Sequence, residues 1–139
     1  MTDETKILQL FYAAALSDAA YHYGRHRVFD KVTQEKKEQQ VFSAKRQLSQ
    51  LGIEGLTDVY KRFSQIFGCA LWSIEEKNGV ITASSNSCLL CALARKQGSP
   101  QPCRPFCINP FTAYAAEFGY ELDVQETLWD GERCLFVHR

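Results

Sequence analysis

Four of the six cysteines lie close together in the sequence, as the pair Cys88 and Cys91 followed by the pair Cys103 and Cys107. The members of each pair are about one helical turn apart, so both sulfurs can face the same point. A proline-rich segment joins the pairs and lets the second fold back on the first. Four such sulfurs could hold zinc or an iron–sulfur cluster. They could equally be reactive or redox cysteines without metal, or structural cysteines, bonded or buried, and the spacing leaves these alternatives open.

Two of these cysteines are also candidate nucleophiles, and one carboxylate is a candidate general base. We expect Cys88 near the start of a short helix, whereas Cys107 follows Arg104 and precedes a helix that begins at Asn109. A helix N-terminus or a neighbouring cation lowers the pKa of a thiol and so favours the thiolate. Glu126 is an exposed strand residue in one interpretation. In the other it lines a pocket and acts as a general base, provided that burial raises its pKa.

The composition narrows the classes of function. The chain has 139 residues, which fits a single domain over 1–139, and 16 basic residues balance 16 acidic ones, so a broad nucleic-acid-binding surface is not expected. No apolar stretch is long enough to span a membrane, and the acidic start does not resemble a signal peptide. We therefore expect a cytoplasmic protein with neither nucleic acid nor membrane as a partner. In an oxidising compartment the cysteines would instead pair as disulfides.

Hydrophobic spacing predicts three helices over about residues 4–68. The first rests on the helical recurrence of Ile7, Leu8, Phe11, Ala15 and Ala19. Thr2 or Asp3 is its expected N-cap, and Gly24 is expected to end or kink it. The second helix is predicted over residues 28–51, with a solvated middle at 35–40. The third is predicted over residues 56–67.

A cysteine-rich α/β part is predicted over about residues 69–139. Apolar and β-branched runs at 69–74 and 80–83 flank an Asn-Gly turn and predict a hairpin. A short helix at 88–96, a proline-rich loop and a helix at 109–119 follow. Strands at 120–128 and 134–138 predict a second hairpin. We expect an α+β fold in which the N-terminal helices pack on a small antiparallel sheet made of the two hairpins.

The histidines and tryptophans carry weaker signals. His22 and His26 are four residues apart but have a glycine between them, so a surface pair is expected rather than a metal site. His138 is expected to be exposed. Trp72 and Trp129 are expected to lie in the core or to line a pocket.

Three segments resemble the family grouped as L-2-amino-thiazoline-4-carboxylic acid hydrolase-like proteins. These segments are residues 88–96, residues 102–110, and residues 126–131 with Cys134. The helical half also looks similar, so the resemblance covers most of the chain. The resemblance implies that water opens a thiazoline ring to yield an N-carbamoyl cysteine.

The C-terminal part also resembles the 4-vinyl reductase-type ligand-binding domains, which share a fold with a transport-particle subunit family. The matching residues are Cys107, Glu126, Thr127, Cys134 and Phe136. Trp129 stands where a further cysteine would be expected, and this departure weakens a metal site carried over from that family.

Together these observations favour a small-molecule hydrolase-like protein that acts on a thiazoline-type or related C–N bond. Cys88, Cys91, Cys103, Cys107 and Glu126 are its expected site residues. The alternative is a small-molecule-binding or sensor module without catalysis, whose cysteines hold metal or respond to redox. A third possibility is an interaction protein whose cysteines stabilise a loop. Phe and Tyr total 15 residues, nine and six, and in a small domain such a number favours a homodimer.

Overall fold

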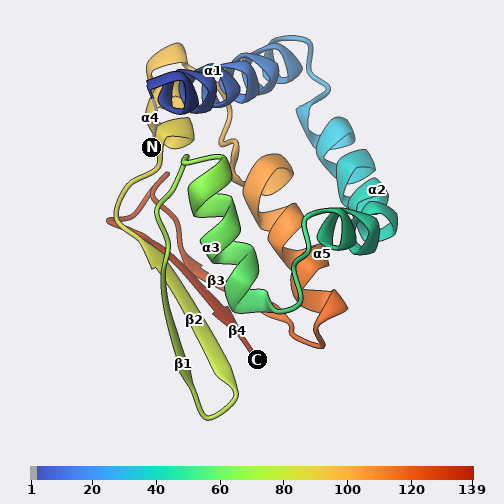
Figure 1. The fold of residues 1–139 in the computed structure, drawn as a ribbon. Helices are drawn as coiled ribbons and strands as arrows, with labels where there is room; N and C mark the ends of the chain where they lie inside the picture. Colours follow the sequence, from blue (N-terminus) through green and yellow to red (C-terminus); the bar gives the residue numbers. More distant parts are fainter. Residues whose placement is uncertain (1–2) are drawn as a thin grey trace.

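The computed structural model describes residues 3–139, so Thr2 lies outside the described part. Within that part the fold is α+β, as predicted (Figure 1). The elements are α1 (Asp3–Arg25), α2 (Phe29–Gln50), α3 (Leu56–Ile66), β1 (Ser73–Lys77), β2 (Val80–Ser85), α4 (Leu89–Gln97), the π-helical turn η1 (Arg104–Ile108), α5 (Asn109–Glu117), β3 (Leu122–Glu126) and β4 (Cys134–His138).

The four strands form one antiparallel sheet in the order β1-β2-β4-β3. The two predicted hairpins are confirmed, and they join through β2 and β4, where Ile81 pairs with His138. The first hairpin turns at Asn78 and Gly79, whose φ angles of 53° and 75° are the left-handed values that this turn requires. β4 is therefore an inner strand with a paired neighbour on each side.

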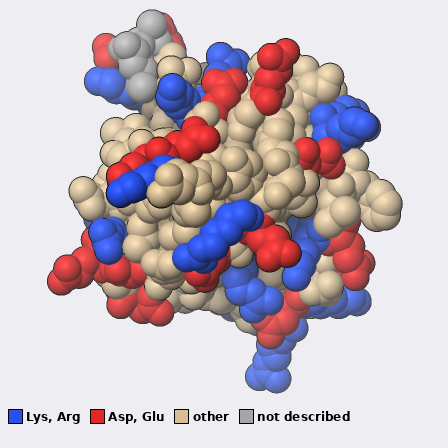
Figure 2. Space-filling view, turned by 90° about the horizontal axis from the view of Figure 1, so that it is seen from below, with Lys and Arg blue, Asp and Glu red and all other residues tan. Residues whose placement is uncertain are grey.

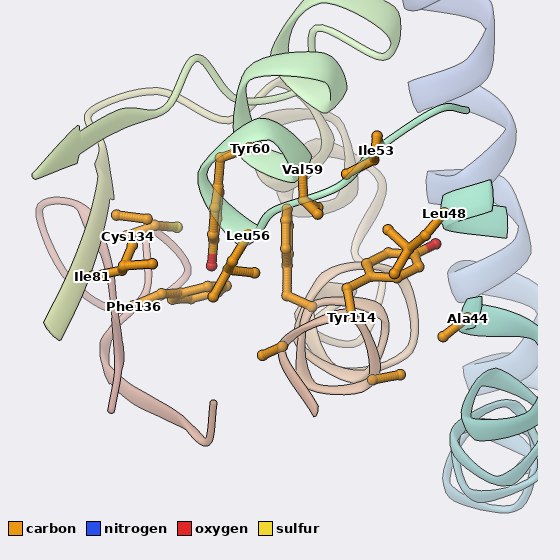
Figure 3. Packing of buried hydrophobic residues seen from close by; sticks show 14 residues of the cluster. Ala44, Leu48, Ile53, Leu56, Val59, Tyr60, Ile81, Tyr114, Cys134 and Phe136 are labelled. Atoms are coloured by element: carbon orange, nitrogen blue, oxygen red, sulfur yellow. The ribbon is translucent and has the colours of Figure 1, made fainter. Parts of the chain in front are cut away.

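The core lies between the sheet and the helices α3 and α5 (Figure 3). Tyr60 of α3 is fully buried and stacks on Phe111 of α5, with ring centroids 4.4 Å apart. Phe136 of β4 closes this aromatic cluster from the sheet side. On α5, Tyr114 faces Leu48 of α2 (Figure 3). Of the three N-terminal helices, α3 supplies the residues that face the sheet, whereas α2 packs chiefly on α5 and α1 lies across α4 (Figure 1).

Helix α1 turns its apolar residues outward. Leu8 and Phe11, which belong to the recurrence that predicted this helix, are 70% and 68% exposed. The buried face instead carries small and polar residues, among them Gln9, Ala13 and Ser17. Small side chains let α1 and α4 approach closely, and the Ser17 hydroxyl donates to the Gln97 side chain at 2.8 Å. The spacing predicted the helix correctly, but the face that packs is not the apolar one.

Helix α1 ends at Arg25, one residue after Gly24, so its predicted end is correct to within one residue. A Cβ at position 24 would lie 2.4 Å from Cγ of Pro100, so the glycine serves a close approach between α1 and the segment after α4. The strand predicted at 69–74 lies further along the chain, since β1 begins at Ser73 and ends at Lys77. The residues before it make an isolated β-bridge, Ala70 with Cys88.

The predicted proline-rich loop contains a helical turn. η1 runs directly into α5, because the residue that joins them, Ile108, has helical φ and ψ angles of −62° and −50°. Cys103 and Cys107 therefore lie on wound backbone rather than on an extended loop.

No helix within residues 3–139 is both long enough and apolar enough to cross a membrane. Acidic and basic side chains are interspersed on the face shown in Figure 2. Their mixture agrees with the formal net charge of zero.

Candidate functional site

A cavity of about 450 Å³ opens between α1, α2, α3, α5 and η1. Aromatic rings form much of its wall, including Phe63, Phe67, Trp72 and Phe111. Three thiols also reach the wall, from Cys69, Cys88 and Cys107. This size and this apolar lining are typical of pockets for small organic ligands.

Helix α2 supplies the polar wall of the cavity through Lys36, Gln40 and Gln47. The Tyr114 hydroxyl donates to the Gln47 side chain at 2.7 Å, and the Gln40 amide donates to the same side chain at 2.9 Å. The ammonium group of Lys36 lies 5.5 Å from the centroid of the Phe106 ring. The solvated middle predicted at 35–40 concealed Lys36 and Gln40, and Gln47 lies beyond it. Gln40 and Gln47 are one and three helical turns after Lys36, which places all three on one face.

Cys88 is the N-cap of α4, as its position near a helix start predicted. Its sulfur accepts a hydrogen bond from the backbone N–H of Cys91 at 3.4 Å. The thiol of Cys91 and the N–H groups of Cys91 and Leu90 lower the pKa of Cys88 to about 7, although burial opposes the shift. A large share of Cys88 is therefore thiolate at neutral pH.

The side chains of Cys91 and Cys103 are in contact, with their sulfurs 3.8 Å apart. Both side chains are buried. The hydrogen bonds to Cys103 and Cys88 raise the pKa of Cys91, and the bond from Cys91 lowers the pKa of Cys103. Cys91 is thus the protonated donor between two acceptor sulfurs.

Cys107 differs from its expected role. Burial raises its pKa well above the ordinary value, and the neighbouring sulfurs of Cys103 and Cys88 add to the effect. The cation that was expected to help, Arg104, points away and lies 4.0 Å from the carboxylate of Asp30 at the surface. The helix N-terminus does not help either, because the wound backbone of η1 continues into α5. Cys107 is a neutral thiol on the cavity wall.

The predicted metal site can be compared with this geometry. Two thiolates bound to a tetrahedral zinc ion with bonds of about 2.3 Å lie about 3.8 Å apart, and the Cys91 and Cys103 sulfurs have that separation. Two sulfurs are half of a four-ligand set. Within residues 3–139, no group of three or more His, Cys, Asp or Glu side chains is arranged to hold a metal ion. The four-cysteine site with Cys88 and Cys107 stays a prediction.

Glu126 does not line the cavity. Its side chain is hydrogen-bonded to the turn before β4. Its carboxylate accepts hydrogen bonds from the backbone N–H groups of Glu132 at 2.7 Å and Arg133 at 3.1 Å. The N–H of Glu132, then that of Arg133 and its guanidinium, lower the pKa of Glu126. A general base at neutral pH needs a raised pKa. Glu126 therefore does not meet the requirement, stated above, that burial raise its pKa.

His138 was expected to be exposed, and this expectation is wrong. The residue is 0% exposed, and its Nε2 lies 2.5 Å from the hydroxyl of Tyr60. Within residues 3–139 its Nδ1 has no hydrogen-bond partner, and burial lowers the pKa of the imidazole to about 4. The signal was available in the sequence, because strand alternation places His138 on the same face as Phe136 and Cys134. His22, in contrast, is at the surface, 3.5 Å from Asp18.

Comparison of the chain with family models, with curated proteins and with solved structures gave no match.

Proposed function

We propose that this chain binds a small organic acid with an apolar or aromatic body in the 450 Å³ cavity and presents the Cys88 sulfur to it. The observation that carries the proposal is the position of Cys88, a sulfur with a pKa of about 7 in the wall of an aromatic cavity. The resemblance to 4-vinyl reductase-type domains supports it, because those domains hold small ligands. We include in this proposal that the chain has the fold of the 4-vinyl reductase-type domains.

The lining indicates the class of ligand. Phe63, Trp72 and Phe111 offer ring faces to a flat apolar body. Lys36 offers a cation to an acidic group, and the amides of Gln40 and Gln47 offer hydrogen bonds beside it. A carboxylate on an aromatic or heterocyclic ring can contact both the aromatic wall, through its ring, and the polar wall of α2, through its carboxylate.

Hydrolysis of a thiazoline-type ring is the second candidate, and the Cys88 thiolate favours it. The sulfur could add to the electrophilic carbon of a ring C=N bond, and the carboxylate of such a substrate would suit Lys36. Release of product then requires an activated water. The described residues that line the cavity include no Asp, Glu or His to accept its proton. Binding is therefore the better supported function.

The rate of alkylation of Cys88 by iodoacetamide tests the binding proposal. We expect the rate to follow an apparent pKa near 7, and millimolar aromatic carboxylates or 2-aminothiazoline-4-carboxylate to slow it. Lys36→Gln should weaken this protection at least tenfold, since a hydrogen bond to a charged group contributes roughly 1.5–3 kcal/mol. Lys37→Gln is the matched control, because Lys37 is an exposed neighbour. The proposal is refuted if no acid protects Cys88, or if both lysine variants behave alike.

Mass spectrometry of 2-aminothiazoline-4-carboxylate incubated with the protein separates the two candidates. Many ring-opened products per chain, lost in Cys88→Ser, would establish hydrolysis. Protection of Cys88 without turnover would establish binding alone.

A further inference from the structure

We propose that Cys88, Cys91 and Cys103 form a thiol–disulfide relay, in which Cys88 attacks a small anionic disulfide and the oxidation ends as a Cys91–Cys103 disulfide. This activity goes beyond ligand binding in the inner cavity. It shares Cys88 with that function but does not depend on Lys36 or on the aromatic wall.

Helical backbone positions the three cysteines. Cys88 and Cys91 are the N-cap and third residue of α4, so they lie on one helical turn. Cys103 has helical φ and ψ angles of −62° and −44° and begins the turn η1, between Pro102 and Pro105. The Cys91 and Cys103 sulfurs need to move from 3.8 Å to about 2.05 Å to form a disulfide.

A second hollow, of about 620 Å³, gives access to this cluster from outside. Cys88 and Cys91 line it, and Cys88, like Cys69, also lines the inner cavity. Arg95 lines the same hollow and is held there by the backbone carbonyls of Leu128 and Trp129. A fixed cation beside two thiols favours a disulfide that carries carboxylates.

The relay consists of three exchanges, each of which forms one S–S bond and breaks one. The Cys88 thiolate attacks the external disulfide, which gives a mixed disulfide and one released thiolate. Cys91 then attacks the Cys88 sulfur and releases the second external thiolate. Cys103 attacks the Cys91 sulfur and returns Cys88 as a thiolate. The protons of Cys91 and Cys103 pass to the two released thiolates. In sum two protein thiols are oxidised, and one external disulfide is reduced to two thiols.

The other cysteines are poorer partners for Cys88. Cys134 accepts a hydrogen bond from the N–H of Leu128, and burial raises its pKa to about 11. Burial likewise raises the pKa of Cys69 to about 11. Among the described residues neither sulfur is hydrogen-bonded to Cys88 or Cys91, whereas Cys91 is hydrogen-bonded to both Cys88 and Cys103.

The test is incubation of the reduced full chain with oxidised glutathione at pH 7 without oxygen, followed by differential alkylation and peptide mass spectrometry. We expect a Cys91–Cys103 disulfide and two equivalents of reduced glutathione per bond. Cys88→Ser should slow its formation at least tenfold. Cys103→Ser should instead accumulate glutathione on Cys88 or a Cys88–Cys91 disulfide. Cys134→Ser is the matched control and should keep the rate, since Cys134 lies outside both hollows.

Three results would overturn the relay. The first is the absence of any disulfide among the three cysteines. The second is an unchanged rate in Cys88→Ser when its melting temperature matches that of the native chain. The third is resistance of all three sulfurs to alkylation until a chelator is added, which would assign them to a metal ion. Protection of Cys88 from alkylation by an organic acid is measured separately from disulfide formation. Failure of the relay therefore does not count against the binding proposal.

Discussion

Lowering the pH from 7 to 5 should destabilise this protein through one residue, His138. The imidazole is fully buried against the hydroxyl of Tyr60, and its other nitrogen has no hydrogen-bond partner in the described part of the chain. A proton added to the folded state would place an unpaired charge in the core, between the sheet and α3. The unfolded chain accepts that proton without this cost.

The size of the effect follows from the two pKa values of His138. Burial lowers the pKa from 6.5 to about 4 in the folded state. Between these values the unfolded chain binds more protons than the folded chain, so stability rises with pH and falls on acidification. Linkage then gives a loss of roughly 2 kcal/mol between pH 7 and pH 5, and roughly 3 kcal/mol by pH 4. Well above pH 6.5 the imidazole is neutral in both states, and its contribution is constant.

Urea unfolding followed by tryptophan fluorescence measures this loss, because Trp72 lies against Tyr60 with ring centroids 5.0 Å apart. Measurements should stop at pH 5, where most carboxylates in the unfolded chain are still ionised. His138→Gln keeps an acceptor for Tyr60 and should remove the slope. His22→Gln, at an exposed histidine, should keep it. A native chain whose free energy of unfolding changes by less than about 0.5 kcal/mol, or an unchanged slope in His138→Gln, would refute the reasoning.

Two further outcomes concern α1. Gly24→Ala should lower the free energy of unfolding by about 1–3 kcal/mol in chemical denaturation, because its Cβ would meet the Pro100 ring at 2.4 Å. In a Pro100→Ala background the same change should cost much less, and equal costs in both backgrounds would contradict the contact. The homodimer proposed from the aromatic content should use the outward face of α1, so Phe11→Asp should weaken association more than tenfold in analytical ultracentrifugation. Phe42→Asp, at an 87% exposed residue of α2, is the control, and a monomeric native chain at high concentration would remove the idea.

The parts of the fold that follow from local sequence were predictable. Asn78 and Gly79 specify their turn without help from the rest of the chain, and the hairpin forms there. The packing of α1 was not predictable, because an apolar stripe predicts a helix but does not say which neighbour covers it. Here α4 packs on the small residues of α1, and the stripe of Leu8 and Phe11 stays outside.

The same division holds for the site. The place of Cys88 at a helix start is a local property, and the sequence predicted it. The contact of Cys91 with Cys103 depends on how η1 folds back, and the raised pKa of Cys107 depends on its burial beside the other sulfurs. Such properties depend on tertiary contacts that residue spacing does not contain.

The inner position of β4 has a consequence for how the molecule reaches its fold. During synthesis β2 and β3 emerge before residues 134–138, so β3 has no partner and β2 has only β1 until the ribosome has passed residue 138. Until then the sheet consists of one hairpin and a single strand, and the ring of Tyr60 has neither Phe136 nor His138 beside it. Helices can form as they emerge, but closure of the core waits for the last strand. We expect nascent chains shorter than 134 residues to expose apolar surface, and chaperones that bind such surface to retain them.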